Sequence, residues 1–381
     1  MIKQIPLFKV FMSPNVDENL LKVLHSGFVG EGEAVKEFEL NIAKYLNNNK
    51  IGLVNSGTSA LHLAYHLSLY GKQAKSYNVD SSLEIISSPM TCTATNTPII
   101  SNSAKIVWAD CDPVTGNICP DSIRKKITSK TKAIVMIHWG GNPCLIDEIN
   151  SIGREYGIKV IEDAAHAFGA EYKGKKIGEI SDFTCFSFQA IKHLTSIDGG
   201  AILSTSEIDN ERIKLLRWFG IDREPKNKES IDLRCEIDVP EAGYKFHMNN
   251  ISAVIGNENL KHMPNVVAKH RENAIFYNKI FEDAGIKVAK EQDNVKSSYW
   301  LYTIHVSNRD ELMQKLKENG IASSKVHARN DTHSMFKDFF DPNLKGVEEF
   351  NHSHICIPVG WWVDEEDRKF IAENVIKYAK K

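Results

Sequence analysis

The sequence is organised around the stretch Ile180-Ser-Asp-Phe-Thr-Cys-Phe-Ser-Phe-Gln-Ala-Ile-Lys192-His-Leu-Thr-Ser-Ile-Asp-Gly-Gly200. It begins as a β-rich run, passes a lysine with no acidic residue within four positions, and ends on a double glycine. A lysine amine can attack a carbonyl once it has lost its proton. Burial among apolar residues favours that loss, because desolvation penalises the charged form. Lys192 is therefore a candidate covalent catalyst; the alternative is an exposed lysine that follows a strand.

A second stretch, Lys159-Val-Ile-Glu-Asp-Ala-Ala-His-Ala-Phe-Gly169, supplies a carboxylate. It predicts a short apolar strand that runs into Asp163, at the edge where parallel sheets place their ligands. Pyridoxal phosphate (PLP) requires both groups: a lysine for its aldehyde, and a carboxylate that keeps its ring nitrogen protonated. Taken alone, an aspartate after a strand is more often a helix cap or a turn residue.

A third stretch, residues 51–67, indicates a strand, a tight turn and a helix. Gly57-Thr58-Ser59 places backbone N–H groups and two hydroxyls at the start of that helix, where the dipole favours an anion. A phosphate site is the functional interpretation. An ordinary capped helix is the alternative.

With these stretches in this order, the chain resembles the DegT/DnrJ/EryC1/StrS family of PLP-dependent nucleotide-sugar aminotransferases. The resemblance rests on Asn55-Ser-Gly-Thr-Ser-Ala-Leu61, Glu162-Asp-Ala-Ala-His166, Ser187-Phe-Gln-Ala-Ile-Lys192, Asp198-Gly-Gly200 and Gly243-Tyr-Lys-Phe-His-Met-Asn-Asn250. It implies an α/β, aspartate-aminotransferase-like (type I PLP) fold. We expect a large PLP-binding domain with a mostly parallel sheet over residues 1–247, and a smaller α+β C-terminal domain over residues 248–381.

The resemblance also implies the roles of individual residues. Lys192 is the catalytic residue, and no metal site is expected. The expected cofactor-binding residues are Gly57, Thr58, Ser59, Cys92, Asp163, His166, Ser187, Lys192 and Lys245. The expected substrate-binding residues are Arg329, His333 and His327. Cys92 departs from the family pattern, because an aromatic side chain usually stacks on the PLP ring from this position.

Residues 243–250 match a loop that, in the family, reaches the cofactor phosphate of a second subunit. We therefore expect a homodimer with shared active sites. Where the family most often has asparagine and arginine, this chain has Lys245 and His247. Lys245 could still bind phosphate as a cation.

The implied reaction moves an amino group from L-glutamate to a keto-sugar carried on a nucleoside diphosphate, with a 4-keto-6-deoxyhexose as the favoured acceptor. A 3-keto-sugar acceptor is the close alternative. A sister branch of the family has histidine at the position of Lys192 and performs dehydration, so the lysine favours transamination. A catalytically idle PLP-binding paralogue stays open because of Cys92, Lys245 and His247. A non-PLP α/β binding protein is a further possibility.

Composition limits the partners. The 381 residues are 42% hydrophobic and 25% charged, as in ordinary globular proteins, and the net charge of −2 favours neither nucleic acid nor a membrane surface. Seven cysteines without a CxxC pair argue against a disulfide framework or a zinc site. The first residues lack the core of a signal peptide, and no apolar run approaches the roughly 20 residues that span a bilayer. The expected location is cytoplasmic.

Periodicity predicts the order of elements. From residue 51 onward, short apolar runs alternate with helical patterns. The apolar runs are 51–54, 84–87, 105–109, 132–138, 158–162, 183–188 and 200–204. This alternation is typical of a doubly wound, mostly parallel sheet. Beyond residue 248, helices at 265–284, 309–319 and 364–379 alternate with strands near 300–306 and 324–327.

Overall fold

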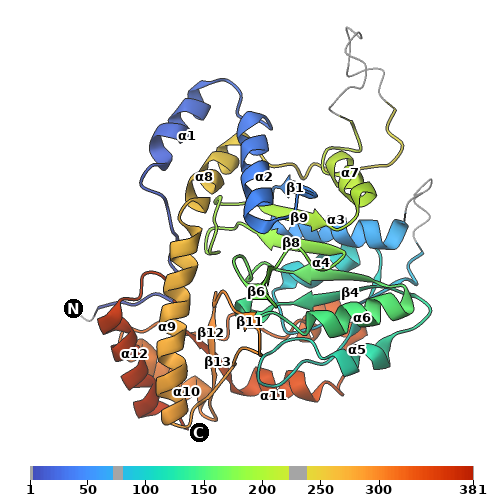
Figure 1. The fold of residues 1–381 in the computed structure, drawn as a ribbon. Coiled ribbons are helices and arrows are strands. Elements are labelled where there is room, and N and C mark those ends of the chain that lie inside the picture. Colours follow the sequence, from blue (N-terminus) through green and yellow to red (C-terminus); the bar gives the residue numbers. More distant parts are fainter. Residues whose placement is uncertain (1–2, 72–79, 223–237, 381) are drawn as a thin grey trace.

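The computed structural model describes residues 3–71, 80–222 and 238–380. Its centre is a seven-stranded sheet in the order β1-β9-β8-β5-β4-β2-β3 (Figure 1). These strands are β1 (Ile51–Val54), β2 (Glu84–Ser87), β3 (Lys105–Trp108), β4 (Thr131–Ile137), β5 (Lys159–Asp163), β8 (Phe183–Ser187) and β9 (Gly200–Ser204). All neighbours from β8 to β3 pair in parallel, whereas β9 is antiparallel to both β1 and β8. The predicted mostly parallel sheet is confirmed.

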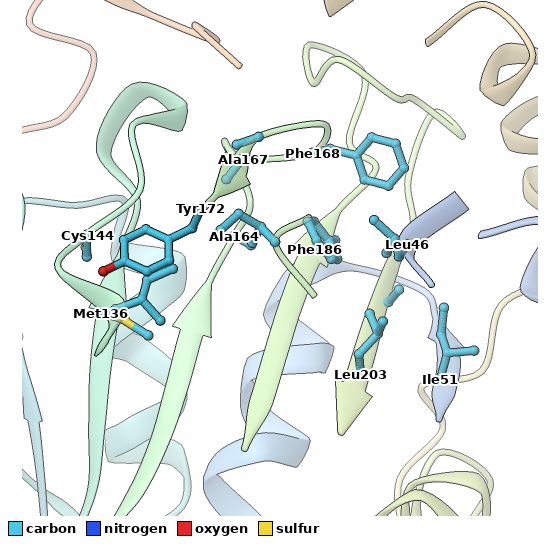
Figure 2. Packing of buried hydrophobic residues seen from close by; sticks show 14 of the residues in the cluster. Leu46, Ile51, Met136, Cys144, Ala164, Ala167, Phe168, Tyr172, Phe186 and Leu203 are labelled. Carbon is cyan, nitrogen blue, oxygen red and sulfur yellow. The ribbon is translucent and has the colours of Figure 1, made fainter. Parts of the chain in front are cut away.

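Alternation along the strands sends apolar side chains into two cores, one on each face of the sheet. On one face, Leu203 of β9, Phe186 of β8 and Met136 of β4 pack with residues of the covering segments (Figure 2). The other face is covered by α3. The helices of this part are α1 (Val16–His25), α2 (Glu33–Leu46), α3 (Gly57–Tyr70), α4 (Thr93–Ser101), α5 (Pro120–Lys126), α6 (Ile146–Tyr156), α7 (Glu207–Leu216) and α8 (Asn250–Leu260).

The C-terminal part forms a third core around a small antiparallel sheet, β10-β12-β13. Its elements are α9 (Met263–Asp283), β10 (Lys287–Val288), β12 (Tyr302–His305), α10 (Arg309–Glu318), α11 (Lys345–Ser353), β13 (His354–Ile357) and α12 (Glu365–Tyr378). This core draws on residues from 274 onward and on Ile5. Helix α8 instead packs against α1 and α2 (Figure 1). The predicted α+β character is present, and the domain boundary at residue 247 stays a prediction.

The predicted strand at 324–327 is wrong. Only an isolated bridge from Ser324 to Cys356 forms there, because Val326 has a φ of 64°, which interrupts an extended chain. Periodicity also missed α11 and β13. A further sheet joins three two-residue strands, β6 (Glu171–Tyr172), β7 (Lys175–Lys176) and β11 (Val295–Lys296).

Candidate active site

Lys192 lies on the connection between β8 and β9, so both ends of its loop are held in the sheet. Its Nζ is 3.6 Å from a ring centroid of Trp300. Burial lowers the pKa of the Lys192 amine to about 8, although the negative charge of Asp163 acts in the opposite direction. The amine therefore loses its proton more readily than an exposed lysine does.

Asp163 ends β5 and is buried. Its Oδ2 accepts a hydrogen bond from the Thr95 hydroxyl at 2.6 Å, and its Oδ1 accepts one from the Ala165 N–H at 3.1 Å. Burial raises the pKa of the Asp163 carboxyl, while the Thr95 and Ala165 hydrogen bonds and the Lys192 charge oppose that rise. Asp163 and Lys192 influence each other electrostatically, so the structure brings both to one site.

Directly behind Asp163, the side chain of Glu162 enters the opposite face of the sheet. Its Oε2 is 2.9 Å from His138 Nε2, and both side chains are fully buried. His138 Nδ1 accepts a hydrogen bond from the Cys144 N–H at 3.1 Å, which leaves Nε2 as the donor to Glu162. This hydrogen bond links β5, next to Asp163, to the residue that directly follows β4.

His166 and His327 form a parallel pair of rings with centroids 5.6 Å apart. Burial lowers the pKa of both imidazoles, and that of His327 falls to about 3. Among the described residues, His166 Nδ1 and His327 Nε2 are buried without a hydrogen-bond partner. Buried polar atoms normally have partners. Two such atoms beside Lys192 indicate that a polar ligand completes the site, as PLP would.

The N-terminus of α3 lies against β8. A Cβ added to Gly57 would be 2.8 Å from Ser187 Cβ, so only glycine allows this approach. The Ser59 N–H donates to Ser56 Oγ, and the Ser59 hydroxyl donates to Asn55 Oδ1. Ser59 thus serves the helix cap. Phosphate binding here would fall mainly to Gly57, the exposed Thr58 and Ser187.

Cys92 directly precedes α4 and lies near enough to Lys192 to influence that amine electrostatically. The Lys245 Nζ lies 4.7 Å from the ring centroid of Trp218 of the same chain, and the Lys245 side chain is exposed. The Asn55 N–H donates to the Phe246 carbonyl, so residues 243–250 run beside the start of α3.

The Arg329 side chain is buried and already paired with carboxylates of the same chain. Its guanidinium donates two hydrogen bonds to Asp331, at 2.8 and 2.6 Å, and a third to Glu348. A substrate carboxylate would have to compete with these partners. His333 is partly exposed at the start of the 3-10 helix η3 (Ser334–Phe339). Roles in substrate binding for Arg329, His333 and His327 stay predictions.

Sequence reasoning missed two residues that touch the central pair. Thr95, which donates a hydrogen bond to Asp163, lies in the first turn of α4, within the threonine-rich run 91–95, and that run is its only signal in the sequence. Trp300 appears in the sequence as an ordinary aromatic residue of a strand. Its indole contacts both Lys192 and His166.

A lysine of lowered pKa on the β8–β9 connection and a buried carboxylate at the end of β5 define the class of the protein. It is a PLP-dependent enzyme with the aspartate-aminotransferase (type I) fold. The chain belongs to the DegT/DnrJ/EryC1/StrS aminotransferase family, whose sequence profile matches residues 12–376.

Individual relatives support this assignment along nearly the whole chain. The uncharacterized protein MJ1066 of Methanocaldococcus jannaschii is 32% identical, over 97% of this chain and 98% of its own. The UDP-4-amino-4,6-dideoxy-N-acetyl-beta-L-altrosamine transaminase of Campylobacter jejuni is 29% identical over 96% of both chains. The crystal structure of the sugar aminotransferase CalS13 from Micromonospora echinospora superposes with a TM-score of 0.91 at 34% identity, covering 98% of this chain and 99% of that one.

Proposed function

We propose that this enzyme transfers an amino group from L-glutamate to a nucleotide-linked keto-sugar, with a 4-keto-6-deoxyhexose as the favoured acceptor. The observation that carries the proposal is that Lys192, whose amine has a lowered pKa, lies within electrostatic range of the buried carboxylate of Asp163. The Campylobacter relative, named for a 4-amino-4,6-dideoxy sugar, supports position 4 over position 3.

PLP, when bound, supplies the aldehyde and an electron sink. Lys192 would hold the cofactor and then, as a free amine, move a proton from the substrate carbon. Asp163 would keep the ring nitrogen protonated, and His166 Nδ1 would meet a polar atom of the ring. Gly57, Thr58 and Ser187 would hold the phosphate at the start of α3.

An absorbance titration tests the reaction class. The purified protein, incubated with PLP, should show a visible band that bleaches when L-glutamate is added. A band that does not respond to any amino donor would favour the idle paralogue. Incubation with glutamate and a set of nucleotide keto-sugars, followed by mass spectrometry and determination of the position of the new nitrogen, then separates 4-keto from 3-keto acceptors.

A homodimer is the second part of the proposal. Exposed apolar side chains gather on α1, α2 and their connection: Leu21, Leu24, Phe28, Val29 and Leu40, with Phe28 79% and Leu40 70% exposed. Helix α1 and the α1–α2 connection lie at the outside of the molecule, away from the central sheet, whereas α2 packs on the sheet with one face (Figure 1). Asn250 Nδ2 donates to the Phe28 carbonyl, which ties this surface to residues 243–250. A second copy of the chain would cover the apolar surface and bring its 243–250 segment to the shared site.

Light scattering on the purified protein should give the mass of a dimer, and Leu40→Asp should shift it toward the monomer. Ile275→Asp is the matched control, because Ile275 is 66% exposed on α9, away from this surface. A monomeric wild-type protein would contradict the proposal.

In the described ranges, 3–71, 80–222 and 238–380, no helix is both long and apolar enough to cross a membrane. The cytoplasmic location stays a prediction.

A further inference from the structure

Trp300 occupies a position between three parts of the chain. Its indole stacks on Phe8 of the N-terminal segment, with centroids 4.9 Å apart, and on His166, with centroids 3.9 Å apart. Its Nε1 donates a hydrogen bond to the Ile191 carbonyl at 2.9 Å. Because Ile191 directly precedes Lys192, this bond fixes the indole relative to the backbone of the lysine.

The same indole receives the lysine side chain, with Nζ 3.6 Å from a ring centroid. Trp300 is only 4% exposed, so little water competes for the ammonium group at this face. A cation over the face of tryptophan is attracted by the ring quadrupole, and desolvation strengthens this attraction. The ring therefore stabilises the protonated amine, against the effect of burial.

We propose that Trp300 is a positioning residue for Lys192, holding its amine over the indole face whenever that amine is not bound to the cofactor. This inference rests on the proposed function for its catalytic meaning, because transamination frees the lysine amine during turnover. Trp300 would then keep the free amine beside Asp163 and limit its exchange into other rotamers.

Other charged and titratable groups also act on this amine. Those that face Lys192 are Asp163, Cys92, His166, His193 and His327. The test must therefore change the ring while these groups stay in place. Trp300→Phe retains an aromatic face, whereas Trp300→Leu retains apolar bulk without one. Trp361→Leu is the matched control, because Trp361 lines the same small hollow beside Lys192 and contacts Phe11 edge-to-face instead of stacking on His166.

The experiment measures the pKa of Lys192 in the cofactor-free protein, from the pH dependence of its acetylation by trace acetic anhydride, followed by mass spectrometry of the peptide. In the wild type the pKa should lie near 8. Trp300→Leu should lower it by about 0.5 to 1 unit, while Trp300→Phe and Trp361→Leu should leave it within about 0.3 unit of wild type. An unchanged pKa in folded Trp300→Leu would overturn the proposal.

A second measurement applies if Trp300→Leu does not fold. Uniform incorporation of fluorinated tryptophan weakens the negative face of the ring and nearly preserves its shape. It should lower the pKa of Lys192 in the wild-type chain and leave it unchanged in Trp300→Phe. An equal shift of the Lys192 pKa on fluorination in both chains, or no shift in the wild-type chain, would refute the contact. Neither measurement uses PLP or a sugar, so the outcome is independent of whether the proposed reaction is correct.

Discussion

Lys192 and Asp163 control each other's charge across the site. Burial acts on both, lowering the pKa of the amine and raising the pKa of the carboxyl, while each charge favours ionisation of the other. The amine is thus held near the point where it can exchange a proton close to neutral pH, as a general base requires.

Replacement of Lys192 by alanine should abolish turnover, by about 10⁴-fold or more, since no other amine takes its place on the β8–β9 loop. The fold should persist, because the change removes a partly buried charge rather than a packed apolar side chain. Turnover assays and thermal unfolding check the two expectations. Retained turnover would refute the assignment of the nucleophile.

The His138–Glu162 pair allows a prediction about stability. His138→Ala leaves the buried Glu162 carboxylate with the more distant Thr184 hydroxyl in place of its imidazole partner, and should lower the free energy of unfolding by about 2–3 kcal/mol. Glu162→Gln, the milder control, retains an oxygen that accepts from His138 Nε2 and should cost about 1 kcal/mol. Urea denaturation measures both. If both variants lost the same free energy of unfolding, the buried charge of Glu162 would not be the cause of the loss in His138→Ala.

The residues of the central pair were predictable from the sequence, because each belongs to a local motif with its own chemistry. Trp300 and Thr95 were not, because their contacts with Lys192, His166 and Asp163 depend on how distant segments pack. Arg329 is a second example of a contact that local sequence does not predict. Its motif suggests that it binds a carboxylate, but in the folded protein that carboxylate belongs to Asp331 of the same chain.

At the scale of elements, the start of α3 depends on its close contact with β8. Gly57→Ala should force this contact apart, because the new Cβ would lie 2.8 Å from Ser187 Cβ. We expect a loss of about 1–3 kcal/mol in unfolding free energy, together with weaker PLP binding. Denaturation and equilibrium dialysis measure the two effects.

A double variant checks that the clash is the cause. Ser187→Gly removes the nearest atom, so Gly57→Ala should cost less in that background than in the wild type. The rescue should be partial, because the Phe186 carbonyl would still lie 3.3 Å from the added Cβ. Strictly additive costs would place the effect of Gly57→Ala elsewhere.

The seven central strands were predictable because each coincides with a short apolar run bounded by turns or helices. The small C-terminal sheet was harder to predict. Strand β13 follows directly on α11, so no loop separates the two patterns in the sequence. The strands of two residues, such as β6 and β11, are too short to show any period.

For the whole molecule, neutral buried histidines predict sensitivity to acid. Burial lowers the pKa of His62, His270 and His354 to about 4, below the ordinary value of 6.5. The unfolded chain therefore binds more protons than the folded one between pH 6.5 and 4, and stability falls as the pH falls through this window.

Urea denaturation at pH 7 and pH 4.5 measures this loss. His270 alone should account for about 2 kcal/mol, and His270→Gln should show a correspondingly weaker dependence on pH. Gln is chosen because its amide can replace the ring as a partner of the Tyr299 carbonyl. If the pH dependence of stability were the same in this variant as in the wild type, the pKa of His270 would not be lowered by folding.

The reversed direction of β9 affects how the protein would respond to cleavage. Because β8 and β9 pair along their whole length, a protease cut within 189–198 would leave both new ends anchored in the sheet. The two fragments should remain associated in native solution and separate only in denaturant. Such a nicked enzyme would keep its fold and lose its activity, because Lys192 would be attached to the sheet through only one of the two strands.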